Sequence, residues 1–216
     1  MTALIANQGP RTSVGPRVRD LARTLGPAPA LRELLGPAAP KTLPYAPHGF
    51  AVLPLEHLEH PEHPVEALRA YPLPGGPVTL VRVPEPGPGD RCAPPFDATA
   101  LLWLRLGLAE GLRRSCVEHL KGRPSGDSTV LLQPLVKAQL AKATAQQMEL
   151  AAWLGRIAAD GTRPSRLRPQ HDQVTGNGRA LLRLFGAFGF LAEGPGGVAH
   201  VSELLAEVHQ DAEEAR

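Results

Sequence analysis

Apolar residues recur with helical spacing over one long stretch of the chain, residues 96–157. Its first half carries apolar side chains at every fourth position: Leu104, Leu108, Leu112, Cys116 and Leu120. This spacing predicts a helix with one apolar stripe, from which Arg105 and Arg113 face away. Asp97, with apolar Phe96 just before it, is the expected N-cap of this helix.

The second half of the stretch predicts a second helix. It is expected to start near Leu131, because Pro134 is tolerated only in or near the first turn. Gly161 is the expected end. The matching stripe consists of Leu132, Leu135, Val136, Leu140, Ala143, Met148, Ala151 and Leu154. The intervening GRPSGDS is typical of a turn, so the two helices form a hairpin, whose stripes the rest of the chain must cover.

Prolines dominate the chain before residue 96. Of the 24 prolines, 19 fall there, and each removes a backbone donor. Short helices are expected at residues 17–25 and 30–35, and strands at 78–83 and, less regularly, at 48–55. We therefore divide the chain into a Pro-rich segment with short helices (1–46), an irregular segment with short strands (47–95) and a helical bundle (96–216).

Glycine-rich and polar sequence separates the later helical segments. Residues 161–178 read as a loop rich in breakers, followed by a short apolar helix at 180–185 that Gly186 and Gly189 stop. A last helix is expected at 198–215. Four helical segments with short links predict an antiparallel four-helix bundle, in a mainly α fold with one or two short strands ahead of it.

The charge balance excludes few partners. The net charge is +2, and aromatic residues make up 4% of the chain. Arg113, Arg114, Lys121 and Arg123 form a basic helix end, but scarce aromatics and an acidic C-terminus argue against nucleic-acid binding. With no run of 18 apolar residues and no secretion-signal pattern, we expect no membrane partner and a cytoplasmic location.

Three histidines at three-residue spacing raise the question of a metal site. His57, His60 and His63 alternate with glutamates, and imidazole and carboxylate groups suit zinc. Pro61 and Pro64, however, break the helix that would align the imidazoles. The pattern favours a solvated loop and leaves metal binding as the alternative.

Three stretches of the sequence, ALLWLRLGLAEGLRRSCVEHLKGR, QPLVKAQLAKATAQQMELAAWL and LLRLFGAFGFLAEGP, occur in an order that resembles the C-terminal helical domain of the acyl-CoA dehydrogenases. ALLWLRLGLAEGLRRSCVEHLKGR is similar to its first helix, and QPLVKAQLAKATAQQMELAAWL, with Leu140-Ala141, to its second. LLRLFGAFGFLAEGP resembles the Gly-Gly-x-Gly-Tyr turn that precedes the last helices. The likeness covers a little over half the chain, and the family's N-terminal helical domain has no counterpart, which implies a truncated or divergent member.

The resemblance implies a flavin site. The family binds FAD between a β domain and this bundle, and removes two hydrogens from an acyl-CoA thioester. Arg123 corresponds to the arginine that contacts the flavin pyrophosphate, and Ser125 replaces the glutamine of the same turn. Gly186 and Gly189 match two glycines of the later turn, and Arg183 stands where a glutamine is usual.

The catalytic base of the family has no equivalent at its usual place. An ungapped count puts Gln210 there, and an amide does not accept a proton at neutral pH. The resemblance therefore implies a subunit that contributes to an FAD site shared with a partner, either a second copy or a longer related chain, and acts on an acyl thioester. The alternative is a non-catalytic helical scaffold or oligomerisation protein derived from the same fold.

Overall fold

The computed structural model describes residues 14–36, 45, 49–58, 65–83, 98–162, 164 and 166–214, with side chains in the last helix described as far as Val208. These parts of the chain are mainly helical, with a small antiparallel sheet. The helices are α1 (Val14–Leu25), α2 (Pro27–Leu35), α3 (Ala98–Lys121), α4 (Pro134–Asp160), α5 (Arg168–Phe185) and α6 (Pro195–Glu214). The strands are β1 (Phe50–Pro54), β2 (Glu66–Tyr71), β3 (Val78–Arg82) and the short pair β4 (Pro124–Ser125) and β5 (Ser128–Thr129).

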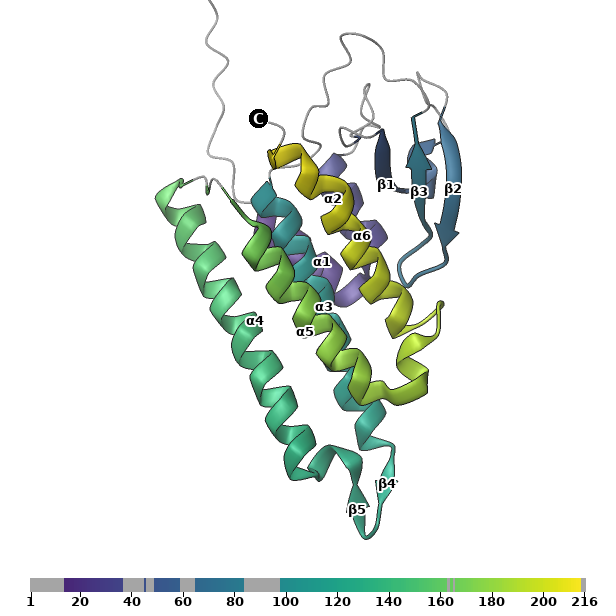
Figure 1. The fold of residues 1–216 in the computed structure, drawn as a ribbon, viewed down its shortest axis with the longest axis vertical. Coiled ribbons are helices and arrows are strands. Elements are labelled where there is room, and N and C mark those ends of the chain that lie inside the picture. Colours follow the sequence, from purple (N-terminus) through teal and green to yellow (C-terminus); the bar gives the residue numbers. More distant parts are fainter. Residues whose placement is uncertain are drawn as a thin grey trace, which may run out of the picture.

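Helix α3 lies at the centre of the molecule. It packs against α1 and α2 on one side and against α4, α5 and α6 on the others, while the sheet stands beside α6 and α2 (Figure 1). All residues from 100 to 110 are buried. A helix that is apolar on nearly all sides is expected at such a position. The expected N-cap, Asp97, lies outside the described residues.

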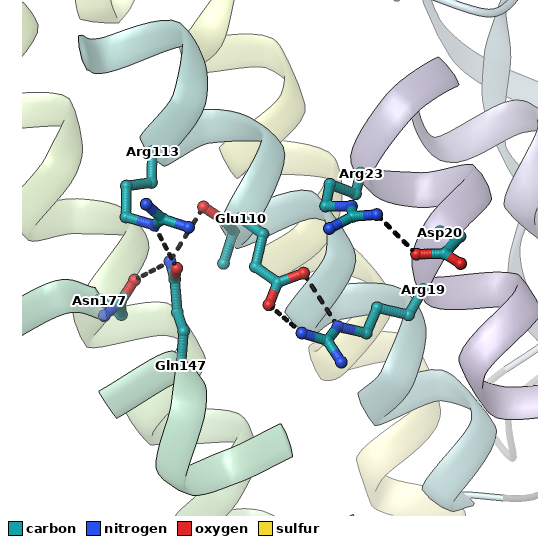
Figure 2. A network of polar contacts seen from close by, with 8 residues as sticks. Arg19, Asp20, Arg23, Glu110, Arg113, Gln147 and Asn177 are labelled. Atoms are coloured by element: carbon teal, nitrogen blue, oxygen red, sulfur yellow. Dashed lines mark hydrogen bonds and ion pairs between the residues drawn. The ribbon is translucent and has the colours of Figure 1, made fainter. Parts of the chain in front are cut away.

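Helix α1 approaches α3 unusually closely. At Gly107 of α3, an added Cβ would lie 2.3 Å from the backbone oxygen of Arg19. Next to this contact, the Arg19 side chain donates two hydrogen bonds to the carboxylate of Glu110, the Nε bond at 2.9 Å (Figure 2). The short helices predicted at 17–25 and 30–35 are thus present as α1 and α2, slightly longer than expected, and both are docked.

The sheet has the order β1-β3-β2, with antiparallel pairing throughout. Both predicted strands are confirmed, as β1 and β3. Strand β2 was not predicted. It is an edge strand whose side chains, apart from Tyr71, are exposed, so it lacks the alternation of apolar and polar residues that marks a half-buried strand.

Helix α4 ends as predicted, with Gly161 in the left-handed conformation (φ 64°, ψ 16°) and its N–H bonded to the oxygen of Ile157. It begins at Pro134, after a 3-10 turn at Val130–Leu132. The predicted apolar stripe of this helix is wrong at three positions, because the side chains of Leu132, Leu135 and Met148 are exposed.

The physical reason for this error is a polar residue on the packed face of α4. Gln147 is buried, and its Nε2 donates to the oxygen of Ala109 (3.0 Å) and to Oδ1 of Asn177 (2.9 Å). Its Oε1 accepts a bond from Nε of Arg113 (2.7 Å) (Figure 2). Gln147 can be buried because both its Nε2 and its Oε1 have hydrogen-bond partners. It therefore lies on the packed face of α4, where the apolar pattern had placed Met148.

The segment predicted as a loop before residue 180 is instead the first half of α5. The buried residues of α5 follow helical spacing: His171, Val174, Asn177, Leu181 and Phe185. Two of them are polar, and Gly176 and Gly178 lie between them, so apolar periodicity alone could not reveal the helix. Among the described residues, no helix has the length and apolar character needed to span a membrane.

Candidate functional site

A cavity of about 510 Å³ opens where β2, the end of α5 and the start of α6 meet. Residues far apart in the sequence converge on it. Its lining consists of Arg69, Tyr71, Arg179, Leu182, Arg183, Phe190, Ala192, Gly196, Gly197, Ala199, His200 and Glu203. Ligand pockets commonly combine an apolar wall with a few polar groups at a volume of this order.

Three arginines line this cavity, and they differ in their partners. Arg179 donates two hydrogen bonds to the carboxylate of Glu203, at 2.9 and 2.8 Å, which raise the pKa of its guanidinium. The Arg69 guanidinium lies 5.2 Å from the ring centre of Tyr71. Arg183 makes no ion pair or hydrogen bond with its side chain in the described part of the chain. Because Glu203 neutralises Arg179, the cavity retains the positive charge of Arg69 and Arg183.

The rest of the lining is apolar or weakly polar. Leu182, Phe190 and Ala199 supply apolar surface, and the Tyr71 hydroxyl lies 3.2 Å from Nε2 of His200. Glu203 is the one carboxylate in the described lining, and its pairing with Arg179 occupies it. The cavity is therefore suited to an anion with an apolar body, and its described lining presents no free carboxylate as a proton acceptor.

The structure brings together two of the residues that the sequence nominated for pyrophosphate binding. Arg123 is exposed in the turn after α3, and its Nη1 lies 3.9 Å from the point where a Cβ on Gly186 would sit. The turn after α5 is held there by aromatic stacking, because the rings of His119 and Phe188 are 4.9 Å apart and nearly parallel. Gly186 has a positive φ of 63°, a conformation that favours glycine.

The other nominated residues lie in different surroundings. Ser125 Oγ accepts a hydrogen bond from Nε2 of Gln133 (3.1 Å) within the β4–β5 turn region. Arg183 lines the cavity. Gly189 is buried, and a Cβ there would lie 2.6 Å from the oxygen of Leu182, so close packing alone requires glycine at this position. Gln210 lies on α6, but its side chain is outside the described part.

Sequence reasoning missed a buried polar group on α3. Arg105, expected to face away from the core, is fully buried and donates to Oγ of Ser202 (3.2 Å), Nδ1 of His171 (2.8 Å) and Oγ1 of Thr175 (2.7 Å). Burial lowers the pKa of its guanidinium to about 10. Arg69 and His200 of the cavity were also missed, since β2 was not recognised and no motif surrounds His200.

The predicted histidine cluster is described only in part. His57 lies in a 3-10 turn, and burial lowers the pKa of its imidazole. His60 and His63 are outside the described residues. Within the described ranges, no group of three histidine, cysteine or acidic side chains is arranged to hold a metal ion.

The site thus has two parts: the cavity with Arg69 and Arg183, and the exposed contact between Arg123 and the Gly186 turn. Both present guanidinium groups that lack a carboxylate partner among the described residues, which is the chemistry of phosphate and carboxylate binding. Comparisons of this sequence with protein-family models and with curated proteins find no match.

Proposed function

We propose that this chain is an acyl-CoA dehydrogenase-like subunit that contributes phosphate-binding residues to a flavin (FAD) site shared with a partner chain. In this proposal, α3 to α6 are the four helices of that family's C-terminal bundle, and the three-stranded sheet is a remnant of its β domain. The substrate class is an acyl thioester.

The observation that carries the proposal is the contact between Arg123 and the Gly186 turn. The two segments are more than 60 positions apart in the sequence, and the resemblance requires them to meet at one pyrophosphate. Arg123 is exposed, lacks a carboxylate partner among the described residues, and lies beside a glycine that leaves room above the backbone. A guanidinium in such a place can donate two parallel hydrogen bonds to a phosphate.

The residues of this chain suit binding rather than chemistry. Arg123 and Arg183 would orient the anionic part of the cofactor, and Leu182 and Phe190 of the cavity lining would contact its apolar part. FAD, when bound, supplies the hydride acceptor. No free carboxylate faces the cavity in the described part of the chain, so the proposal assigns the proton-accepting base to the partner chain.

Flavin binding tests this proposal directly. The protein, purified from its native host together with its partner, is expected to show visible flavin absorbance. With FAD added to the apo complex, Arg123→Gln should weaken binding tenfold or more, because a charge-assisted hydrogen bond contributes about 1.5–3 kcal/mol. Arg82→Gln, which removes an exposed arginine of β3, is the matched control and should bind FAD as the unaltered protein does. Absence of flavin from both the chain and its complex would refute the proposal.

The second candidate is a non-catalytic helical scaffold descended from the same fold. The close packing of Gly189 and Gly197 favours this candidate. A Cβ atom at these positions would lie 2.6 and 2.0 Å, respectively, from a backbone oxygen of the same chain. Packing therefore explains these glycines without any ligand. A protein that binds no flavin yet forms a defined oligomer would fit this candidate and exclude the first.

A further inference from the structure

One face of α4 has no partner in the described part of the chain. The helix packs on α3 and α5 through Leu140, Ala143, Gln147, Leu150 and Leu154. On the opposite side, Leu135 and Met148 are 71% and 67% exposed. Figure 1 shows α4 at the left edge of the molecule, and its main helical neighbours among the described elements are α3 and α5.

The exposed face carries a heptad pattern. Its positions alternate three and four residues apart, and all are exposed: Ala138, Ala141, Ala145, Met148, Ala152, Gly155 and Ala159. None is charged, whereas the neighbouring exposed positions hold Lys142, Glu149 and Arg156. A helix that faces only water is expected to be polar across its exposed side, and an apolar seam flanked by charges is typical of helix pairing.

We propose that α4 packs against α4 of a second copy of this chain, antiparallel, about a two-fold axis that passes between Ala145 and Met148. In this heptad, Ala138, Ala145, Ala152 and Ala159 are first positions, and Ala141, Met148 and Gly155 are fourth positions. In the antiparallel register, first positions of one helix face fourth positions of the other. Ala145 then faces Met148 of the partner subunit, Ala141 faces Ala152 of the partner subunit, and Ala138 faces Gly155 of the partner subunit. Small side chains at these layers let two helix axes approach to about 8 Å.

Charge complementarity selects this occupant and this orientation. In the antiparallel register, Lys142 lies within about one turn of Glu149 of the partner subunit, and two-fold symmetry creates this pair twice. Within the described residues, neither side chain has an ion-pair partner in its own chain. A parallel pair would instead bring Lys137 next to Lys142 of the partner subunit, and like charges there oppose association.

This inference does not depend on the flavin. The seam consists only of α4 residues, and the cavity is formed by β2, α5 and α6. Self-association with no flavin would support the scaffold candidate. Flavin bound by a complex of one copy of this chain with a different partner chain, and no self-association, would support the first candidate while overturning this inference.

Sedimentation of the full chain over a range of concentrations measures the association. The unaltered protein is expected to be a dimer, and Ala145→Glu a monomer, because two carboxylates would then meet at the centre of the seam. Gln139→Glu adds the same charge at an exposed position of α4 outside the seam and should remain dimeric. Circular dichroism of both variants shows whether each is folded. A monomeric unaltered protein, or a dimer that tolerates Ala145→Glu, would overturn the proposal.

Charge-reversal variants distinguish an antiparallel from a parallel pair of α4 helices, because Lys142→Glu should weaken the first and strengthen the second. Lys142→Glu and Glu149→Lys should each weaken the dimer several-fold, and the double variant should restore it. In a parallel pair, Lys142→Glu would strengthen association by attracting Lys137 of the partner subunit. Strengthening by the single change, or no recovery in the double variant, would therefore exclude the antiparallel register.

Discussion

Arg105 shows how a single buried residue departs from the expected pattern. Its guanidinium is fully buried, and its hydrogen-bond partners within the described residues are neutral groups of α5 and α6. A guanidinium donates through a fixed planar fork, and here the fork serves His171, Thr175 and Ser202 together. Because Nδ1 of His171 accepts one of these bonds, its imidazole is neutral in this arrangement, with its proton on Nε2.

The fork geometry predicts that lysine cannot replace Arg105. Arg105→Lys retains a buried charge but cannot reach all three side chains, so the free energy of unfolding should fall by about 2 kcal/mol or more. Arg156→Lys, at an exposed position of α4, should change it by less than about 0.5 kcal/mol. Urea denaturation measures both. Equal stability of the two variants would show that the fork is not needed.

Cys116 provides a second prediction for a buried residue. Burial raises the pKa of its thiol from 9.0 to about 11. Above pH 9 the unfolded chain therefore releases this proton before the folded chain does, and the folded state loses stability as pH rises from about 9 to 11. Between pH 8 and pH 10, the unaltered protein should lose roughly 1 kcal/mol more than Cys116→Ala does. Urea midpoints at the two pH values test this, since all other groups titrate alike in both proteins.

Among the helices, the contact between α1 and α3 depends on the absence of a side chain. A Cβ at Gly107 would lie 2.3 Å from the Arg19 oxygen and 2.8 Å from Cβ of Ala22. Gly107→Ala should lower the free energy of unfolding by about 1–3 kcal/mol, as overpacking does, and should make α1 more accessible to proteolysis. Gly176→Ala in α5 is the matched control, because open space surrounds that position and alanine should stabilise the helix by about 0.5–1 kcal/mol.

The elements that the sequence predicted best have simple local signals. Leu104 and its neighbours at every fourth position predicted α3, Gly161 marked the end of α4, and β-branched residues marked β3. The start of α5 and the whole of β2 were missed because their signals are not local. In α5, His171 and Asn177 occupy buried positions that depend on partners in other helices, and β2 is stabilised by pairing with β3.

For the site, sequence reasoning nominated Arg123, Arg183 and Gly186 through a family resemblance, and their arrangement required the structure. The turn after α5 lies against the end of α3, where the rings of His119 and Phe188 stack. These two residues are far apart in the sequence, so no local spacing predicts their contact. Arg69 lines the cavity because it lies on β2, a strand that the sequence did not predict. Predicting such a site requires the tertiary arrangement, which local patterns do not specify.

On the scale of the whole molecule, segments that the sequence separates share one core. One apolar cluster contains Val18 of α1, Leu31 of α2, Val52 of β1, Leu104 of α3 and Leu205 of α6. Two further clusters join other faces of α3 to α4 and α5. Each face of α3 is therefore buried by a different part of the chain, and no part buries all of them.

This arrangement predicts that residues 98–216 do not form a stable domain alone. Without α1, α2 and the sheet, the apolar side chains of Leu101, Leu104 and Leu108 would meet water, and the carboxylate of Glu110 would lose Arg19. The fragment should retain helical circular dichroism but unfold over a broad range of urea and bind a hydrophobic dye. The full chain should unfold in one transition that tryptophan fluorescence, from Trp103 and Trp153, and circular dichroism report alike. A sharp, cooperative transition of the fragment would instead establish the helical part as an independent domain, with the proline-rich first half an attachment to it.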